Sequence, residues 1–220
     1  EPTELKDSGV KWIGEIPEHW EVKRLRNLFR FSKGLTITKE NLQDDGIPCV
    51  SYGEIHSKYG FEVNPEVHPL KCVSEEYLRN NQKSLVNQDD FIFADTSEDL
   101  EGSGNFTYLN FDGTVFAGYH TIIGKPKNQI NSRFLAYVLD SLPFRNQVRT
   151  QMKGVKVYSI TQSILKNLIC WFPKEYEQTE IAKLLDSQST KIDKAITLQE
   201  QQIEKLKELK STLIDSAVTG

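Results

Sequence analysis

The chain has 220 residues, of which 38% are apolar, enough for one globular domain with an extension or for two small domains. The net charge of −4 argues weakly against a wholly basic nucleic-acid-binding protein, and the apolar runs are too short to cross a bilayer. Cys49, Cys72 and Cys170 have no paired metal-ligand spacing and are expected to be reduced thiols. The chain begins at Glu1 without Met, which leaves a trimmed start open. No signal peptide opens it, and we expect a cytoplasmic protein with no membrane partner.

Acidic and basic residues are distributed unevenly along the chain. Residues 86–113 contain seven acids and no Lys or Arg, whereas residues 125–158 contain seven bases and one acid. A phosphate backbone needs only one basic surface. The pattern permits DNA binding, but solvated charge runs are also common.

In the first 60 residues, Trp12 and Trp20 flank a Pro-containing turn that indicates an arm pinned by aromatic anchors. Residues 22–29 predict a short strand or helical turn. Residues 47–52 predict a buried strand after a turn. The stretch 52–60 combines aromatics, Gly, His and Lys in what we expect to be a loop, suited either to base contacts or to an ordinary surface.

The middle of the chain predicts a short helix at 74–81, a turn and strand over 85–94, and a strand over 115–124 interrupted by a Gly. Tyr119 and His120 in that last strand either project from a concave surface or belong to the core. Between these elements, residues 96–105 predict an acidic loop. Its carboxylates resemble a metal-dependent nuclease cluster, but the Lys that usually follows such acids is absent, which argues against catalysis.

The pattern after residue 130 is helical. Ser132 is expected to cap a helix that Pro143 breaks, and a second helix follows from Phe144. Residues 153–158 predict a basic, Gly-centred loop suited to phosphate contacts. Thr161 is expected to cap a short helix, residues 168–172 form a strand, and a long helix begins near Glu175.

The long helix carries an apolar stripe with steps of three, four and seven residues between about 177 and 218. Some 40 residues make a rod of roughly 60 Å. A narrow stripe suits a coiled-coil seam, although a helix packed on its own domain is the alternative. Gln188 and Gln199 along the stripe either help to set register or face solvent. The expected seam residues are Leu185, Ile192, Ile196, Ile203, Leu206 and Leu213.

No motif in the chain indicates catalysis. It lacks the Asn/Asp-Pro-Pro-aromatic run of amino-methyltransferases, a GxxxxGK[ST] loop, HExxH, GxSxG and paired Cys/His ligands. We therefore expect a non-enzymatic chain without a metal or a cofactor of its own.

Both ends of the chain resemble one family. Residues 7–20 (DSGVKWIGEIPEHW) are similar to the opening of specificity subunits of type I restriction–modification systems. So are Ile164-x-x-x-Leu168-Ile169-x-x-x-Pro173, Glu177-Gln178-x-x-Ile181-x-x-x-Leu185, and the closing LIDSAVTG of residues 213–220. The matches occur in the family's order and span nearly the whole chain.

The resemblance implies an α+β (mixed) target recognition domain at residues 1–174 and a conserved spacer helix at 175–220 that forms a coiled coil. Family chains usually carry two such units, each reading one half of a split DNA target. They recruit two adenine methyltransferase subunits, which bind S-adenosylmethionine, and in full complexes ATP-dependent restriction subunits. With one unit, this chain is either a half-subunit that forms a homodimer or half of a longer chain.

The resemblance transfers no base-contacting residue, because recognition domains vary most in the family. Local chemistry alone gives the candidate DNA-binding residues: Lys33, Tyr52, His56, Lys58, Tyr59, Tyr119, His120, Lys153, Lys156 and Tyr158. Two other hypotheses remain open, a coiled-coil assembly protein without DNA contact and a nuclease that uses the acidic loop.

Overall fold

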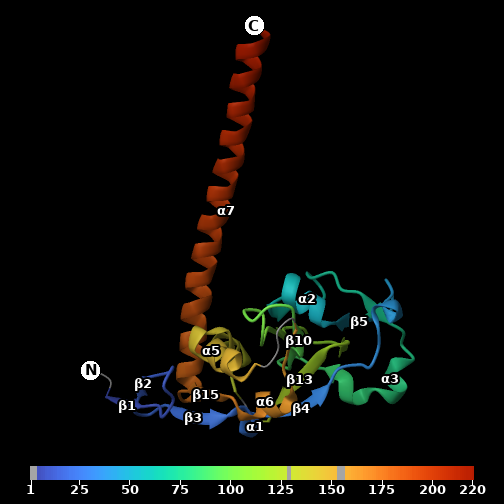
Figure 1. The fold of residues 1–220 in the computed structure, drawn as a ribbon, viewed down its shortest axis with the longest axis vertical. Helices are drawn as coiled ribbons and strands as arrows, with labels where there is room; N and C mark the ends of the chain where they lie inside the picture. Colours follow the sequence, from blue (N-terminus) through green and yellow to red (C-terminus); the bar gives the residue numbers. More distant parts are fainter. Residues whose placement is uncertain (1–3, 128–129, 153–156) are drawn as a thin grey trace. The chain divides into compact units, whose positions relative to one another are not determined.

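The computed structural model describes residues 4–127, 130–152 and 157–220. Two compact units, Glu1–Gln178 and Thr179–Gly220, divide the chain. The first unit contains every strand and helices α1 to α6, and it also includes the first residues of α7. The expected mixed α+β fold with a long C-terminal helix is confirmed (Figure 1).

A five-stranded sheet forms the centre of the first unit. Its strand order is β4-β13-β9-β11-β6, and only β11 and β6 pair in parallel. The strands are β4 (Phe29–Lys33), β6 (Phe61–Val63), β9 (Phe91–Ala94), β11 (Phe106–Leu109) and β13 (Thr121–Pro126).

A four-stranded sheet with the order β7-β5-β12-β8 packs against it. Its strands β12 and β5 pair in parallel, while the other two pairs are antiparallel. The strands are β5 (Ile47–Val50), β7 (Cys72–Val73), β8 (Leu85–Val86) and β12 (Val115–Ala117).

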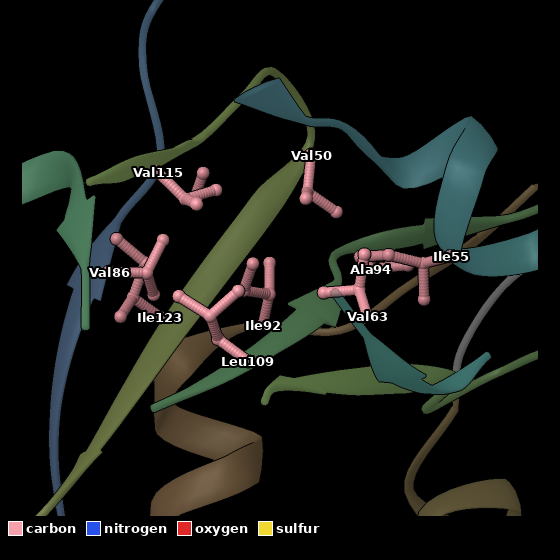
Figure 2. Close-up of a cluster of buried hydrophobic side chains, with 10 residues drawn as sticks. Val50, Ile55, Val63, Val86, Ile92, Ala94, Leu109, Val115 and Ile123 are labelled. Carbon is pink, nitrogen blue, oxygen red and sulfur yellow. The ribbon is translucent and has the colours of Figure 1, made fainter. Parts of the chain in front are cut away.

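The aliphatic core lies between these two sheets, as Figure 2 shows. Successive side chains of a strand point to opposite faces, so Ile92 and Ala94 of β9 enter this core while Phe91 and Phe93 do not. Side chains of β5, β8 and β12 meet them from the smaller sheet. The buried residues are Val50, Ile55, Val63, Val86, Ile92, Ala94, Leu109, Val115, Ala117 and Ile123.

Aromatic side chains cover the other face of the larger sheet. The Phe91 ring lies 5.4 Å from Phe29, 6.4 Å from Phe93 and 6.0 Å from Phe106. Helix α4 contributes to this layer, because Tyr137 lies 4.9 Å from the ring of Phe61. The first unit is thus layered as small sheet, large sheet and helices.

Shorter elements complete the first unit. The small strands form the pairs β1-β2, β3-β15 and β10-β14: β1 (Leu5–Asp7), β2 (Glu15–Pro17), β3 (Glu21–Arg24), β10 (Thr96–Ser97), β14 (Tyr158–Ser159) and β15 (Ile169–Phe172). The helices are α1 (Leu25–Leu28), η1 (Lys39–Asn41), α2 (Tyr52–Ser57), α3 (Tyr77–Asn80), η2 (Gln82–Ser84), α4 (Ser132–Asp140), α5 (Leu142–Gln151) and α6 (Gln162–Asn167).

The N-terminal arm is fastened to the beginning of α7 (Glu175–Thr219). Trp20 Nε1 donates to Glu177 Oε1 at 3.1 Å, and His19 Nε2 lies 2.8 Å from Glu177 Oε2. The Trp20 ring also meets Phe134 edge-on at 6.5 Å. Only one expected aromatic anchor is therefore confirmed, since Trp12 is 41% exposed.

Several other expectations about local structure need correction. Residues 52–57 form helix α2 rather than a loop, because Glu54 accepts a hydrogen bond from the Ser51 amide and caps the helix. The single strand expected over 115–124 is two strands in different sheets. Asn131, not Ser132, caps α4: its side chain accepts from the Phe134 amide at 2.9 Å.

Helix α7 runs without interruption for 45 residues. Its expected seam residues Ile192, Ile196, Ile203, Leu206 and Leu213 are all at least half exposed, and Leu185 is half-buried. Gln188 and Gln199 are exposed as well. No helix among the described residues is long and apolar enough to span a membrane.

Candidate nucleic-acid interface

Tyr52 and His56 are presented by helix α2. The Ser51 amide donates to Glu54 Oε2 at 3.0 Å, and this capping contact starts the helix at Tyr52. Residues four apart share a helix face, and the two rings lie 6.1 Å apart, edge to face. The short helix therefore displays both rings together.

Tyr119 and His120 are presented by the turn between β12 and β13. A Cβ at Gly118 would collide with Ser51 Oγ and lie 2.9 Å from Cys49 Sγ, so only glycine allows this turn to approach the start of α2 so closely. His120 itself has a φ of +54°, and its carbonyl accepts from the Asp95 amide at 3.0 Å. The turn is held from both sides.

These four residues form one group, the aromatic–histidine cluster (Tyr52, His56, Tyr119 and His120). Tyr52 lies at its centre, with its ring 5.6 Å from Tyr119 and 5.3 Å from His120. Edge-to-face contacts of this kind are favourable for aromatic rings. Within the part of the chain that the structure describes, neither tyrosine hydroxyl has a hydrogen-bond partner, so both are open to a ligand.

His120 is oriented by Asp95. The imidazole Nδ1 lies 3.2 Å from Asp95 Oδ1, and the Thr96 hydroxyl donates to the same oxygen at 2.8 Å. Because an ionised carboxylate can only accept, Nδ1 carries the proton that it donates. Nε2 then makes no hydrogen bond to any described residue, and the exposed ring edge can accept one from a ligand.

His56 is oriented more completely. Its Nε2 donates to the Thr96 carbonyl at 2.8 Å, and its Nδ1 lies 2.9 Å from Asn105 Nδ2. Asn105 Oδ1 accepts from Arg145 at 2.8 Å, and Arg145 in turn donates to Asp140 at 2.7 Å. Both ring nitrogens are thus occupied. His56 supports the cluster and has no free nitrogen for a base.

Burial raises the pKa of Tyr119, and the neighbouring carboxylate of Glu54 raises it further. The hydroxyl of Tyr119 therefore stays protonated at neutral pH. A protonated phenol can both donate and accept. A group with both roles suits contacts with base edges, which present hydrogen-bond donors and acceptors.

A cleft of about 360 Å³ lies next to the cluster. Lys58, Phe61 and Arg145 are among the side chains that line it, together with His56 and Asn105. Lys58 is exposed, whereas Arg145 is paired with a carboxylate. The candidate Lys58 thus lies beside the cluster with its charge available.

The other candidates have different surroundings. Tyr158 is in β14, paired with Ser97 of β10, and Lys33 of β4 pairs with Ile122, two residues after His120. Tyr59 points elsewhere, since its hydroxyl donates to Pro69 and its ring stacks on His68 at 4.7 Å. The candidates Lys153 and Lys156 lie outside the described residues.

The acidic stretch that resembled a nuclease cluster begins with β10 and continues as a loop. Asp99 there accepts from the Gly102 amide at 2.5 Å, and Asp95 is engaged by His120 and Thr96. Among the described residues, no group of three or more His, Cys, Asp or Glu side chains could hold a metal ion. Asp95 and Asp99 thus act in hydrogen bonds within this region.

The sequence did not point to Asp95, Thr96 or Asn105 as part of this site. Their roles depend on the pairing of β10 with β14 and on the approach of α5, which are contacts between distant parts of the chain. The one local signal is that Asp95 and Thr96 follow directly after the apolar run of β9. Strand ends commonly carry such polar side chains.

Comparison with known proteins places the chain in a family. Residues 17–208 match the family model described as "Type I restriction modification DNA specificity domain". The chain belongs to this family. The family expected from the sequence is therefore confirmed.

Curated relatives carry the same designation. The chain is 23% identical over 214 residues to the type I restriction enzyme EcoKI specificity subunit of Escherichia coli, covering 94% of this chain and 44% of the relative. It is 26% identical over 175 residues to the putative MjaX specificity subunit of Methanocaldococcus jannaschii, covering 79% and 40%. The chain thus spans less than half the length of these relatives.

Solved structures share the fold. A chain from a study of complex assembly and conformational transition in the type I restriction–modification system superimposes with a TM-score of 0.67, at 16% identity, over 93% of this chain and 46% of that one. The HsdS subunit of Thermoanaerobacter tengcongensis gives 0.57, at 14% identity, over 86% and 41%. The specificity-domain family and its fold extend over nearly all of the chain.

Proposed function

We propose that this chain recognises the sequence of one half of a bipartite double-stranded DNA target. The observation that carries the proposal is the aromatic–histidine cluster, where the hydroxyls of Tyr52 and Tyr119 and Nε2 of His120 have no partner among the described residues. Such groups read base edges by hydrogen bonding. The family's description as a DNA specificity domain supports the same function.

The cluster suits base reading better than phosphate binding. Its polar edges come from neutral side chains and from a histidine beside Asp95, and a neighbouring acid disfavours a phosphate but accepts from an amino group of cytosine or adenine. Lys58, Lys33 and Tyr158 flank the cluster and serve as secondary candidates. Lys153 and Lys156 remain predictions for phosphate contact.

The chain works as a homodimer in this proposal. Helix α7 carries exposed apolar residues over most of its length, including Ile192, Ile203 and Leu213, and a stripe of this kind needs a partner helix. A two-fold contact between identical helices is self-complementary. Two recognition units joined in this way would read an inverted repeat with an unread gap.

The chain itself is non-catalytic in this proposal. It docks adenine methyltransferase subunits, which bring S-adenosylmethionine and perform the reaction, and an ATP-dependent restriction subunit joins in a full complex. The names of the relatives, which are specificity subunits of type I restriction enzymes, support this division of labour. Cleavage of DNA by the purified chain with Mg²⁺ alone would instead favour a nuclease.

The direct test uses selection from random DNA duplexes followed by single-residue variants. Tyr52→Phe, Tyr119→Phe and His120→Ala should each weaken binding to the selected target by roughly 1–3 kcal/mol and leave non-specific binding unchanged. The matched control is Tyr59→Phe. The Tyr59 hydroxyl donates to the Pro69 carbonyl, so its removal should leave DNA recognition unchanged. Selection of no sequence, with methyltransferase subunits still bound, would favour a coiled-coil assembly role without DNA reading.

A further inference from the structure

Five basic residues lie on neighbouring elements around β4, the edge strand of the larger sheet, and this group is here named the basic border. Its members are exposed, and no described carboxylate lies within ion-pair distance of them. By contrast Lys23, Lys125 and Arg145 each pair with an acid. The members of the basic border are Arg26, Arg30, Lys33, Lys83 and Lys166.

The elements that carry these residues are free of acids. Residues 25–33, 82–84 and 162–167 contain the five bases and no Asp or Glu, in a chain where acids outnumber bases by 31 to 27. Their positive charge is therefore not balanced locally. Unbalanced charge of one sign on one surface raises the local concentration of an oppositely charged partner.

Specific contacts bring the elements that carry the border together. Helix α1 packs against both α6 and β4, and β4 packs against η2; Figure 1 shows α1, α6 and β4 together. The Ser32 hydroxyl donates to the Lys83 carbonyl at 3.0 Å, which ties η2 to β4. At the other end, Lys127 Nζ donates to the Arg26 carbonyl at 2.6 Å and brings a further cation to α1.

One end of the border adjoins the aromatic–histidine cluster. Lys33 pairs with Ile122, and the Gly34 amide donates to the Thr121 carbonyl at 3.1 Å, directly after His120. From Lys33 the border follows β4 away from the cluster toward Phe29. Four strand residues cover about 13 Å, which is close to four base-pair steps of about 3.4 Å along one DNA strand.

We propose that the basic border binds the phosphate backbone of double-stranded DNA next to the bases that the aromatic–histidine cluster reads. This inference rests on the proposed function and adds a sequence-independent anchor to it. Phosphate contacts fix the register of a protein on the duplex, while base contacts select the sequence. In this proposal the aromatic–histidine cluster selects the bases and the basic border holds the backbone.

Edge protection is the competing explanation for part of the border. Strand β4 lies at the end of its sheet, and charged side chains on such strands block pairing with other chains. That explanation covers Arg30 and Lys33 but not Arg26 or Lys166, which are on helices. The two accounts differ in the salt dependence of DNA binding.

The test measures DNA affinity between about 50 and 200 mM salt for the full chain and the triple variant R26Q/R30Q/K33Q. The proposal predicts a salt slope that is smaller by about 0.9 for each lost contact, thus by about 2.7, and at least about tenfold weaker binding to target and random duplexes alike. The selected sequence should not change. R26K/R30K, which retains the charges, should keep most of the slope.

The matched control is K6Q/K11Q/K39Q, which removes three exposed cations from elements outside the border and should leave the slope unchanged. An unchanged slope in R26Q/R30Q/K33Q, with sequence selection intact in the parent chain, would overturn this inference and leave the proposed function standing. A parent chain that selects no sequence would contradict the proposed function itself. A triple variant that keeps its DNA slope but no longer co-purifies with methyltransferase would show that the border docks a protein.

Discussion

Asn105 connects His56 to Arg145 through both ends of one amide. Its Nδ2 lies 2.9 Å from His56 Nδ1, and its Oδ1 accepts from Arg145 at 2.8 Å. Since a guanidinium can only donate, this arrangement fixes which end of the amide faces the histidine and which nitrogen of the imidazole is protonated. Arg145 of helix α5 is thereby linked through Asn105 to His56 of helix α2, the helix that also carries Tyr52.

Asn105→Ala should disturb recognition without touching a base. The variant leaves His56 Nδ1 and the Arg145 guanidinium each without one partner, at a cost of about 1–3 kcal/mol in the free energy of unfolding. Urea unfolding measures this loss, and affinity for the target should fall with it. Asn110→Ala is the control, because the side chain of the exposed Asn110 bonds only Glu62 and its loss should change neither quantity. Equal effects of both variants would contradict a positioning role for Asn105.

Gly118→Ala should destabilise the turn that carries Tyr119. The added Cβ would collide with Ser51 Oγ, and overpacking of this kind costs about 1–3 kcal/mol. Gly53→Ala provides the contrast, since no atom lies within 4 Å of its added Cβ and Ala favours helix by up to about 1 kcal/mol. Thermal unfolding should show opposite shifts for the two variants. A Gly118→Ala protein as stable as its parent would mean that the turn is looser than described.

The buried thiols predict a loss of stability at alkaline pH. Burial raises the pKa of Cys49 to about 12 and raises the pKa of Cys170 as well, compared with about 8.5 in an unfolded chain. A raised thiol pKa contributes stability that is complete below about pH 8.5 and is lost as the pH rises toward the folded value. Urea unfolding should therefore give a lower free energy at about pH 10 than at about pH 7.

Thiol labelling checks the same point independently. At about pH 8, Cys49 and Cys170 should react slowly with a thiol reagent in the native protein and rapidly in denaturant, because the thiolate is the reactive form. Cys49→Ala should reduce the alkaline loss of stability. Rapid labelling of Cys49 in the native state would show that its surroundings are more open than the structure indicates.

Trp20→Phe should weaken the attachment of the N-terminal arm to the first turn of α7. The change keeps an aromatic ring against Phe134 but removes the indole hydrogen bond to Glu177. A hydrogen bond to a charged acceptor contributes about 1.5–3 kcal/mol. Chemical unfolding of Trp20→Phe and of Trp12→Phe, which alters an exposed side chain, should differ by about that amount.

Local patterns predicted many of the elements but not how the strands pair. The strand of residues 168–172, the Thr161 cap and the start of the long helix at Glu175 follow from apolar spacing and Pro positions, and all three are observed. The strands β4, β6 and β11 were not predicted. The five residues Phe29–Lys33 alternate Phe with charged and polar residues. Their identity as a strand depends on pairing with β13, about 90 residues later.

The candidate site was predicted in part for the same reason. The residue types at Tyr52, His56, Tyr119 and His120 suggested base contacts, and the fold brings these four together. Thr96 and Asn105 occupy both ring nitrogens of His56, while Asp95 orients His120. These contacts make His56 a supporting residue and leave the other three available to a ligand. Those contacts join segments up to 49 residues apart, and no local pattern in the sequence records them.

Mapping of adenine methylation tests the central claim most directly. The host would express this chain with its cognate methyltransferase subunit, with Tyr52→Phe and His120→Ala as comparison strains. The account predicts one methylated motif, an inverted repeat with a fixed gap, and a relaxed or lost motif in the two variants. Absence of any methylated motif, with both proteins soluble and associated, would contradict the claim that this chain reads DNA.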